Sequence, residues 1–293
     1  MKILSNSNLK EFNSYRISST ACKIFLPETI EDFQDLFIKE KNNNYSIIGG
    51  GNNVILADNN YENVRFVIVS SNFSKSSVDA TNNTIEAYSG TSLKSLSVLA
   101  LEYGLKGLEI FYDIPGTLGG AVWMNAGAYG ETFMELVKEV TIINKETKSI
   151  ETLQSENIER GYRYSQFQDN KSVILSAVLQ LETGNKADIE AKMLKYYNIR
   201  NEKLPKEYPN AGSVFRRPPD GLTVGEMVEI LSLKGKQIGG AQISKKHGGF
   251  IVNYENASGN DVLALVDLIK EEILSKYNIE LHLEQIVIND NIA

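Results

Sequence analysis

The chain contains very little cysteine and histidine. Its 293 residues include one cysteine, Cys22, and two histidines, His247 and His282. One cysteine excludes an internal disulfide and a thiolate metal cluster, and two histidines far apart in sequence argue against a histidine-based metal site. We therefore expect no structural metal.

Long apolar runs are also missing. No stretch approaches the ~20 apolar residues that a membrane span needs, and the N-terminus turns polar after Leu4 without an apolar signal region. The composition, 42% hydrophobic and 23% charged, is that of an ordinary globular protein. We predict a cytoplasmic protein with no membrane partner.

The net charge of −7 leaves no excess of basic residues for a general nucleic-acid binder, because phosphate backbones are bound by broad basic surfaces. The region from Arg200 to Lys246 is the exception, with nine basic and five acidic residues. We predict a small anionic ligand there and no nucleic-acid partner. Solvated surface lysines explain the same count equally well.

Apolar runs and helical spacings alternate along the chain, which predicts an α+β fold. Helices are expected near 30–37, 93–103, 189–197 and 262–273. Strands are expected at 45–48, 66–69, 84–88, 137–143, 150–153, 173–181 and 281–288. The turn residues Thr183 to Asn185 predict a domain boundary, giving domains 1–185 and 186–293.

The most informative segment is IPGTLGGAVWMNAGAYG, from Ile114 to Gly130. It has five glycines and one proline, interleaved with apolar side chains rather than with the charges and serines of a flexible linker. Glycine permits close backbone approach to a ligand and positive φ angles. We interpret the segment as a cofactor cradle that uses main-chain N–H groups.

A second glycine cluster, GGGNN, occupies Gly49 to Asn53. It is no Walker loop, because no Gly-Lys-Ser/Thr follows, and it lacks the third glycine and the helix of a GxGxxG motif. A turn of this kind between two strands can present an anion nest, with the amides of Asn52 and Asn53 as further donors. The alternative is a tight β-turn without a ligand.

The segment YPNAGSVFRRP, Tyr208 to Pro218, places Ser213 in a bend beside two arginines. This serine is a candidate proton donor or phosphate ligand, and the alternative is a turn-capping serine. No G-x-S-x-G elbow surrounds it and neither histidine is an obvious base, which disfavours a serine-hydrolase triad.

Taken together, the chain resembles the UDP-N-acetylenolpyruvoylglucosamine reductase (UDP-N-acetylmuramate dehydrogenase) family. Six motifs appear in the family's order and cover almost the whole chain. The gap of under fifty residues between Arg163 and Ser213 is similar to the family's shorter class, which lacks an inserted tyrosine-bearing loop. The motifs are GGGNN, IPGTLGGAVWMNAGAYG, GYRYSQF, PNAGSVFRRP, LKGKQIGGAQISKKHGGFIVN and LEQIVI.

The resemblance implies a vanillyl-alcohol-oxidase-like FAD domain of two α+β subdomains, about 1–79 and 80–185, followed by a smaller α+β substrate domain. FAD is expected between the glycine loops and non-covalently bound, because neither histidine precedes residue 247 and Cys22 lies outside both clusters. NADPH is the implied co-substrate. The implied cofactor-binding residues are Gly49, Gly50, Gly51, Asn52, Asn53, Pro115, Gly116, Thr117, Gly119, Gly120, Asn125, Gly127 and Ala128.

The implied reaction completes the lactyl ether of a peptidoglycan precursor. NADPH reduces the flavin, and flavin N5 then passes hydride to the enolpyruvyl substrate. By motif position Arg163 binds the substrate carboxylate, Glu284 assists it, and Ser213 delivers the proton. The residues alone leave alternatives open: Arg163 as a clamp on backbone carbonyls, and Glu284 on a solvated strand face.

The implied substrate is a small nucleotide sugar, bound by Asn210, Arg216, Lys234 and Lys246, and a monomer is expected. Three departures from the family pattern occur at Ser18–Ser19, Asp113 and Leu204. Two rival interpretations are a flavin-dependent oxidase that uses O₂ and a degenerate homologue that binds flavin as a sensor.

Overall fold

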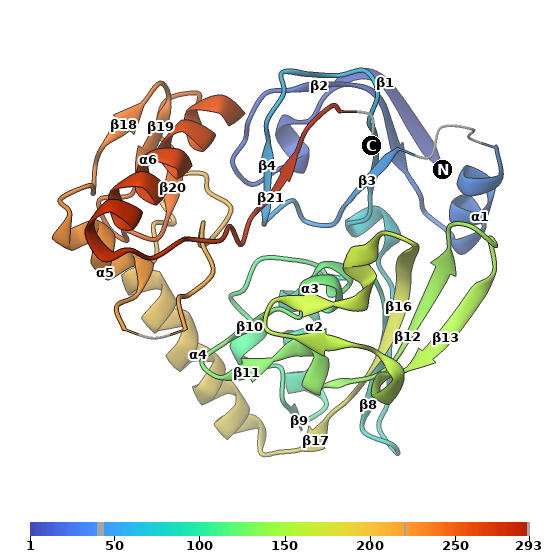
Figure 1. Ribbon diagram of the computed structural model, residues 1–293. Coiled ribbons are helices and arrows are strands. Elements are labelled where there is room, and N and C mark those ends of the chain that lie inside the picture. Colours follow the sequence, from blue (N-terminus) through green and yellow to red (C-terminus); the bar gives the residue numbers. More distant parts are fainter. Residues whose placement is uncertain (40–43, 220, 292–293) are drawn as a thin grey trace. The chain divides into compact units, whose positions relative to one another are not determined.

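The computed structural model describes residues 1–39, 44–219 and 221–291 (Figure 1). The chain forms two compact units, and each is assembled from separate stretches of sequence. Unit 1 consists of Met1–Ile3, Phe25–Gly50 and Phe66–Arg200. Unit 2 consists of Leu4–Ile24, Gly51–Arg65 and Asn201–Ala293.

Unit 1 is built on an antiparallel five-stranded sheet of order β13-β12-β16-β8-β7. The central strand β16 is buried from Val173 to Ala177 and apolar there except at Ser176, as expected for a strand covered on both faces. Val140 faces Ala177, which in turn faces Ala87, so that small and branched side chains meet across the sheet. The strands are β7 (Ser76–Asp79), β8 (Thr84–Tyr88), β12 (Val137–Asn144), β13 (Ile150–Gln154) and β16 (Ser172–Gln180).

Two helices pack their apolar faces onto this sheet. Helix α2 (Leu93–Glu102) begins at Ser92, whose side chain accepts a hydrogen bond from Ser95 N, and α3 (Leu118–Met124) begins at Thr117. Their buried side chains form one core with the sheet, comprising among others Ile85, Leu93, Leu96, Ala100, Leu118, Ala121, Val122, Val140 and Leu179.

A second apolar core of unit 1 lies beneath helix α1 (Ile30–Lys39). Phe33 and Phe73 meet edge to face, with ring centroids 4.9 Å apart. Strand β3 (Tyr45–Ile48) runs beside β6 (Arg65–Ile68), and Val69 N donates to Ile48 O at the end of this pair. The residues that follow β3 are the first glycines of GGGNN, so this core supports the candidate site.

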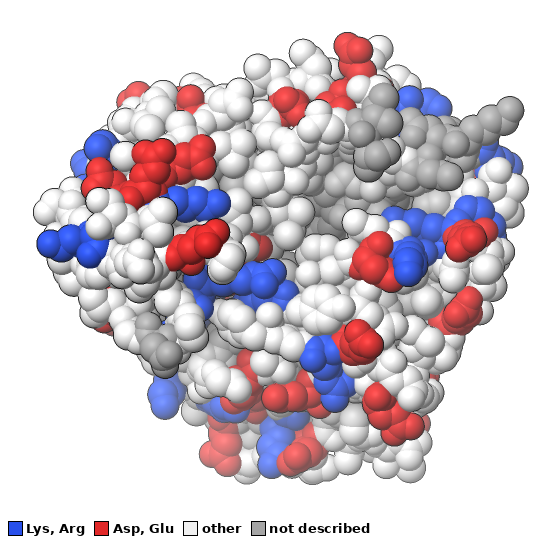
Figure 2. Space-filling view, viewed as in Figure 1, with Lys and Arg blue, Asp and Glu red and all other residues white. Residues whose placement is uncertain are grey.

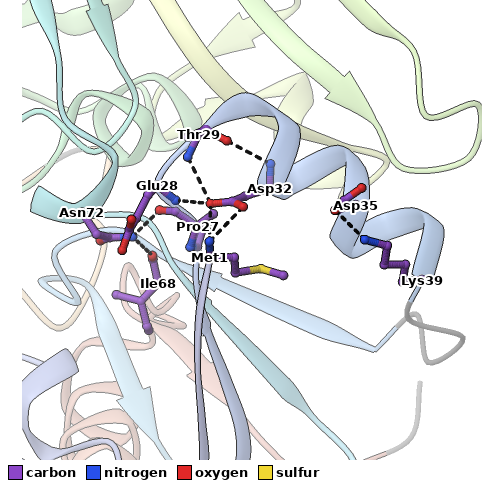
Figure 3. A network of polar contacts seen from close by, with 9 residues as sticks. All are labelled: Met1, Pro27, Glu28, Thr29, Asp32, Asp35, Lys39, Ile68 and Asn72. Carbon is purple, nitrogen blue, oxygen red and sulfur yellow. Dashed lines mark hydrogen bonds and ion pairs between the residues drawn. The ribbon is translucent and has the colours of Figure 1, made fainter.

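The start of α1 is stabilised by Asp32 (Figure 3). Its carboxylate accepts hydrogen bonds from Glu28 N at 2.8 Å and Thr29 N at 3.2 Å, and it pairs with the Met1 ammonium at 2.9 Å. Burial opposes the charge of Asp32, yet these donors hold the pKa of its carboxyl below the usual value. The chain terminus and the helix are thereby tied together.

Unit 2 contains a three-stranded antiparallel sheet, β18-β19-β20, covered by helix α6 (Gly259–Tyr277). A capping box of Ser258 and Asp261 starts α6, and Asn278 ends it in the left-handed conformation. Strands β4 (Val54–Leu56) and β21 (Ile286–Ile288) pair in parallel, joining the residues after GGGNN to the C-terminal motif. Unit 2 also contains β5 (Asn60–Tyr61), α5 (Val224–Ile230), β18 (Gln237–Ile238), β19 (Ala241–Ile243), β20 (Ile251–Asn253) and most residues of β1 (Lys2–Asn8) and β2 (Thr20–Leu26).

Short elements complete both units. In unit 1, β10 pairs with β11, β14 with β15 and β9 with β17, each antiparallel. Their bounds are β9 (Leu105–Lys106), β10 (Gly127–Ala128), β11 (Glu131–Thr132), β14 (Arg160–Gly161), β15 (Tyr164–Ser165) and β17 (Glu182–Thr183). The 3₁₀ helices are η1 (Lys10–Phe12), η2 (Ser71–Phe73), η3 (Glu109–Phe111), η4 (Phe133–Glu135), η5 (Ser155–Asn157) and η6 (Gln166–Asp169).

Most elements predicted from the sequence are confirmed, but the closing strand predicted at 281–288 is wrong in its first half. Only Ile286–Ile288 form a strand, while Leu283 makes a single bridge to Phe215. Local alternation misled the prediction because the segment turns to bury Gln285, which is 2% exposed. The α+β class itself is confirmed.

Helix α4 (Lys186–Lys203) belongs to unit 1 as far as Arg200. Its Lys192 ammonium lies 3.1 Å from Glu131 and 3.5 Å from the buried carboxylate of Glu109, and Arg200 pairs with Asp113 at 2.9 Å. Asp113, a departure from the family pattern, thus has a partner in this chain. The domain ranges 1–185 and 186–293 stay a prediction.

Among the residues that the structure describes, no helix is both long and apolar enough to cross a bilayer.

Candidate active site

The two glycine segments meet within unit 1. A Cβ atom added to Gly49 would lie 2.4 Å from Thr117 Oγ1, far inside van der Waals contact. Gly49 therefore packs its main chain directly against the residue that starts α3, and only glycine fits there. The structure thereby brings together two segments that are separated by more than sixty residues in the sequence.

The second segment uses its N–H groups internally. Leu118 N donates to Thr91 O and Gly119 N to Ser89 O, each at 2.8 Å, and Gly120 N donates to Thr117 Oγ1 at 3.4 Å. The first N–H groups of a helix normally lack partners inside it, and here all three find one in unit 1. This part of the segment is a packed helix start rather than an open nest.

The first segment keeps its donors available. Between described residues, the N–H groups of Gly49 and Gly50 donate no main-chain hydrogen bond. Successive unpaired N–H groups in a turn form a concavity that suits a phosphate. The predicted anion nest is therefore compatible with the geometry at these two glycines.

A third segment, Ser89 to Ser92, lies against the second glycine segment and was missed by the sequence analysis. A Cβ on Gly119 would lie 2.7 Å from Ser89 Cβ, and one on Gly90 would lie 2.0 Å from Ser70 O. Ser89 is 2% exposed, and its Oγ has no hydrogen-bond partner among the described residues. A glycine flanked by serines directly before a helix was the signal for this segment.

Asn125, Gly127 and Arg163 are predicted site residues of unit 1 that contact one another's main-chain neighbourhood. Asn125, left-handed with φ 43°, accepts from Met134 N at 3.2 Å and donates to Gly161 O at 2.8 Å. A Cβ on Gly127 would lie 2.4 Å from Glu131 O across the β10–β11 pair. Asn125 thus fixes the main chain around it through its side-chain hydrogen bonds, and the position of Gly127 leaves no room for a side chain.

Arg163 is held at this end of the site by Gly127. It sits in the turn between β14 and β15 with φ 54°, and its Nη2 donates to Gly127 O at 2.8 Å. The left-handed conformation of a non-glycine residue destabilises the fold by about 1–3 kcal/mol, and residues in such conformations are concentrated at functional sites. The carbonyl clamp considered from the sequence is therefore present, and the guanidinium has five N–H donors in total.

In unit 2, the rest of GGGNN holds the C-terminal motif. Gly51 has φ 66°, and a Cβ there would lie 2.2 Å from Phe12 O. Asn53 Nδ2 donates to Glu284 O at 3.0 Å, and Ile286 N donates to Asn53 O at 2.9 Å. Asn52 Oδ1 accepts from Ser14 Oγ at 2.5 Å. The turn therefore positions the main chain of Glu284.

The Ser213 segment runs antiparallel to the Glu284 segment. Arg216 N donates to His282 O and Glu284 N donates to Val214 O, each at 2.9 Å. Ser213 is exposed and Glu284 half-buried. The structure thus brings together, in one unit, two of the three predicted catalytic residues from positions more than seventy residues apart.

The predicted substrate-binding residues differ in how fully they are engaged. Asn210 donates to Pro205 O at 2.8 Å and to Tyr208 O at 2.9 Å, while its Oδ1 accepts from Gly212 N, so its side chain builds the turn before Ser213. Lys246 Nζ donates to Asn201 O at 3.0 Å. By contrast, the buried Nε of Arg216 has no partner among the described residues.

Lys234 belongs to a group of charges of both signs. It pairs with Glu229 at 3.1 Å, and on the face in view basic and acidic side chains are interspersed over the part that contains α5 and β18–β20 (Figure 2). Burial lowers the pKa of His247, and the charges of Lys234 and Lys203 lower it further. Burial and these charges therefore favour the neutral form of the His247 imidazole.

Metal ligands do not gather in the described part of the chain. Across residues 1–39, 44–219 and 221–291, no three histidine, cysteine or carboxylate side chains lie close enough to hold an ion.

The fold and the glycine segments together define a flavin-binding oxidoreductase. Residues 23–152 match the FAD binding domain family, and residues 204–288 match the C-terminal domain of UDP-N-acetylenolpyruvoylglucosamine reductase. The orphaned Ser89 hydroxyl and the available N–H groups of Gly49 and Gly50 fit a phosphorylated cofactor.

Full-length relatives make the assignment specific. A UDP-N-acetylenolpyruvoylglucosamine reductase of Francisella tularensis is 45% identical over 96% of this chain and 98% of its own length. Another, of Syntrophomonas wolfei, is 38% identical over 99% and 96%. The crystal structure of the Thermus caldophilus reductase superposes with a TM-score of 0.81 at 27% identity, covering 98% of both chains.

The chain belongs to the UDP-N-acetylenolpyruvoylglucosamine reductase family. The family, the fold class, the enzyme class and the FAD cofactor predicted from the sequence are thereby confirmed.

Proposed function

We propose that this chain reduces UDP-N-acetylenolpyruvoylglucosamine to UDP-N-acetylmuramate, a peptidoglycan precursor, with non-covalent FAD, NADPH as co-substrate, and Arg163, Ser213 and Glu284 as catalytic residues. The observation that carries the proposal is the main-chain pairing of the Ser213 and Glu284 segments within unit 2. The names of the relatives supply the substrate.

FAD is held by the main chain more than by side chains. The N–H groups of Gly49 and Gly50 suit its pyrophosphate, and the Ser89 hydroxyl offers one further donor. The wider binding set is the one predicted from the sequence, from Gly49 to Asn53 and from Pro115 to Ala128. When bound, FAD supplies the two-electron chemistry, taking hydride from NADPH and passing it to the enolpyruvyl double bond.

Ser213 delivers the proton that completes the reduction. Hydride addition at the terminal vinyl carbon pushes an electron pair toward the carbon that bears the carboxylate, and this carbon must then gain a proton. A serine is a weak acid, so it serves only when the acceptor is very basic and the hydroxyl is already aligned. The nearby Arg216 favours the transient alkoxide, which solvent then reprotonates.

Arg163 binds the substrate carboxylate and spreads the developing negative charge. Its bond to Gly127 O orients the guanidinium, whose planar set of donors suits a carboxylate. Glu284 assists at the same carboxylate, its own position set by Asn53 and Val214.

The nucleotide-sugar part of the substrate binds to Arg216, Lys234, Lys246 and Asn210. The unpartnered Nε of Arg216 supports a role toward phosphate oxygens. Lys234 and Lys246 act by exchanging their present partners, Glu229 and Asn201 O, for the ligand. We further propose a cytoplasmic monomer with a FAD-binding domain at 1–185, a substrate domain at 186–293, and no nucleic-acid or membrane partner.

Stopped-flow kinetics of Ser213→Ala tests this function. We expect NADPH to reduce the flavin nearly as fast as in the wild type, while reoxidation by the enolpyruvyl substrate slows by about 10²–10⁴, the range for a positioned acid. Equal impairment of both half-reactions contradicts the role of Ser213. Unchanged reoxidation would favour a flavin sensor, and rapid reoxidation by O₂ alone would favour an oxidase.

A further inference from the structure

Gln285 is a buried amide next to the catalytic motif with no role in the mechanism so far. It is 2% exposed. Its Oε1 accepts from the Tyr15 hydroxyl at 3.0 Å, and its Nε2 donates to Ala211 O at 3.0 Å and to Gly212 O at 3.1 Å. All these residues belong to unit 2.

The chemistry of these partners leaves one orientation for the amide. Carbonyl oxygens can only accept, so the NH₂ group must face Ala211 and Gly212. Burial raises the pKa of the Tyr15 phenol, which therefore keeps its proton and donates to Oε1. Tyr15 is itself fixed, since it is fully buried and its carbonyl accepts from Asn253 Nδ2 at 2.7 Å.

These hydrogen bonds fix the main chain on both sides of Ser213. Ala211 and Gly212, the acceptors of Nε2, directly precede Ser213, while Val214, which follows it, accepts from Glu284 N. Gly212 is in the left-handed region with φ 81°, and glycine adopts positive and negative φ angles about equally readily. Its own conformational preference therefore does not hold this bend in place. Without the amide, the peptide between Ala211 and Gly212 keeps its bond from Gly212 N to Asn210 Oδ1, but no other hydrogen bond among the described residues reaches the carbonyls of Ala211 and Gly212.

We propose that Gln285 is a positioning residue that aligns the Ser213 hydroxyl with Glu284 for the proton-transfer step. The inference rests on the function proposed above. Gln285 touches neither substrate nor cofactor in this role, and it acts by holding the two main-chain carbonyls that set the direction of the Ser213 bend.

A double-mutant cycle with the FAD-loaded enzyme tests the coupling. Gln285→Met keeps the length of the side chain but removes both donors. We expect reoxidation of the reduced flavin by the enolpyruvyl substrate to slow about ten- to a hundredfold, because a misplacement of about 1 Å has this effect. In a Ser213→Ala background the same substitution should slow it less than about twofold, since there is no hydroxyl left to position.

Two controls separate positioning from general damage. Gln242→Met makes the same change at another buried glutamine of unit 2, 6% exposed on β19, and should leave both half-reactions within about twofold. Tyr15→Phe removes only the phenol hydroxyl, so it keeps the proposal testable if Gln285→Met folds poorly. It should slow reoxidation about two- to fivefold, again only when Ser213 is present.

The outcomes distinguish the two proposals. If Ser213→Ala slows reoxidation but Gln285→Met slows it by the same factor with and without Ser213, the positioning role is overturned and the proposed function stands. If Ser213→Ala leaves reoxidation unchanged, the proposed function is overturned, and the role of Gln285 with it. Equal slowing of flavin reduction by NADPH also overturns the positioning role, because it indicates a general loss of structure.

Discussion

Two parts of the glycine segments, Gly49–Gly50 and the start of α3 at Leu118–Gly120, use their main-chain N–H groups in opposite ways. Gly49 and Gly50 keep N–H groups that no described main-chain acceptor takes, whereas Leu118, Gly119 and Gly120 donate to Thr91, Ser89 and Thr117. Glycine allows close packing in both segments, at Gly49 against Thr117 and at Gly119 against Ser89, but at Gly49 and Gly50 it also leaves N–H donors for a ligand. A glycine-rich motif therefore does not by itself reveal which groups bind the cofactor.

The largest effect is expected from Gly51→Ala, which breaks the first segment. The new Cβ would lie 2.2 Å from Phe12 O in a residue with φ 66°. Backbone strain and overlap together should lower the free energy of unfolding by roughly 2–5 kcal/mol. Urea denaturation measures the loss. Gly130→Ala, at φ 88° with no atom within 4 Å, is the control for strain alone and should cost roughly 1–2 kcal/mol.

Gly49→Ala should weaken FAD binding about ten- to a hundredfold, because its Cβ displaces Thr117 and distorts both segments where they meet. Fluorescence titration of the apoprotein with FAD measures the change. The double variant Gly49→Ala/Thr117→Ala removes the Oγ1 atom in conflict and should recover part of the affinity. No recovery would mean that the close approach of Gly49 to Thr117 is not what limits binding.

Adjacent helical glycines offer a matched pair in the second segment. Gly119→Ala meets Ser89 Cβ at 2.7 Å and should destabilise the protein by about 1–3 kcal/mol. Gly120→Ala has only Thr117 Oγ1 nearby, at 3.6 Å, and should stabilise α3 by roughly 0.5–1 kcal/mol. Thermal unfolding of both variants tests this, and similar melting temperatures would contradict the packing role.

Ser89→Ala is expected to have the smallest effect. It should stabilise the apoprotein but weaken the binding of FAD. Its buried hydroxyl lacks a partner, so its removal should stabilise the apoprotein by up to about 1 kcal/mol. FAD affinity should fall about three- to tenfold if the hydroxyl serves the cofactor. Melting curves with and without FAD give both values, and unchanged FAD affinity would remove Ser89 from the site.

Sequence reasoning succeeded where the physical cause was local. Helix α2 ends at Glu102 and is followed by its C-cap Tyr103 and by Gly104, and β8 spans Thr84–Tyr88, both close to what the apolar spacing indicated. It failed at residues 281–285, because the burial of Gln285 depends on Tyr15 and Ala211, which are remote in sequence. Alternation in a short segment carries no information about such partners.

The sequence by itself determined the family, the flavin cofactor, the α+β class and the identity of the candidate catalytic residues, because these follow from motif order and residue chemistry. Only the tertiary structure decided which glycine N–H groups stay unbonded, that Arg163 is held by Gly127, and that the main chain around Ser213 pairs with the main chain around Glu284. The physical reason is that hydrogen-bond satisfaction depends on groups that folding brings together, such as Asn53 and Glu284, which are 231 residues apart in the chain.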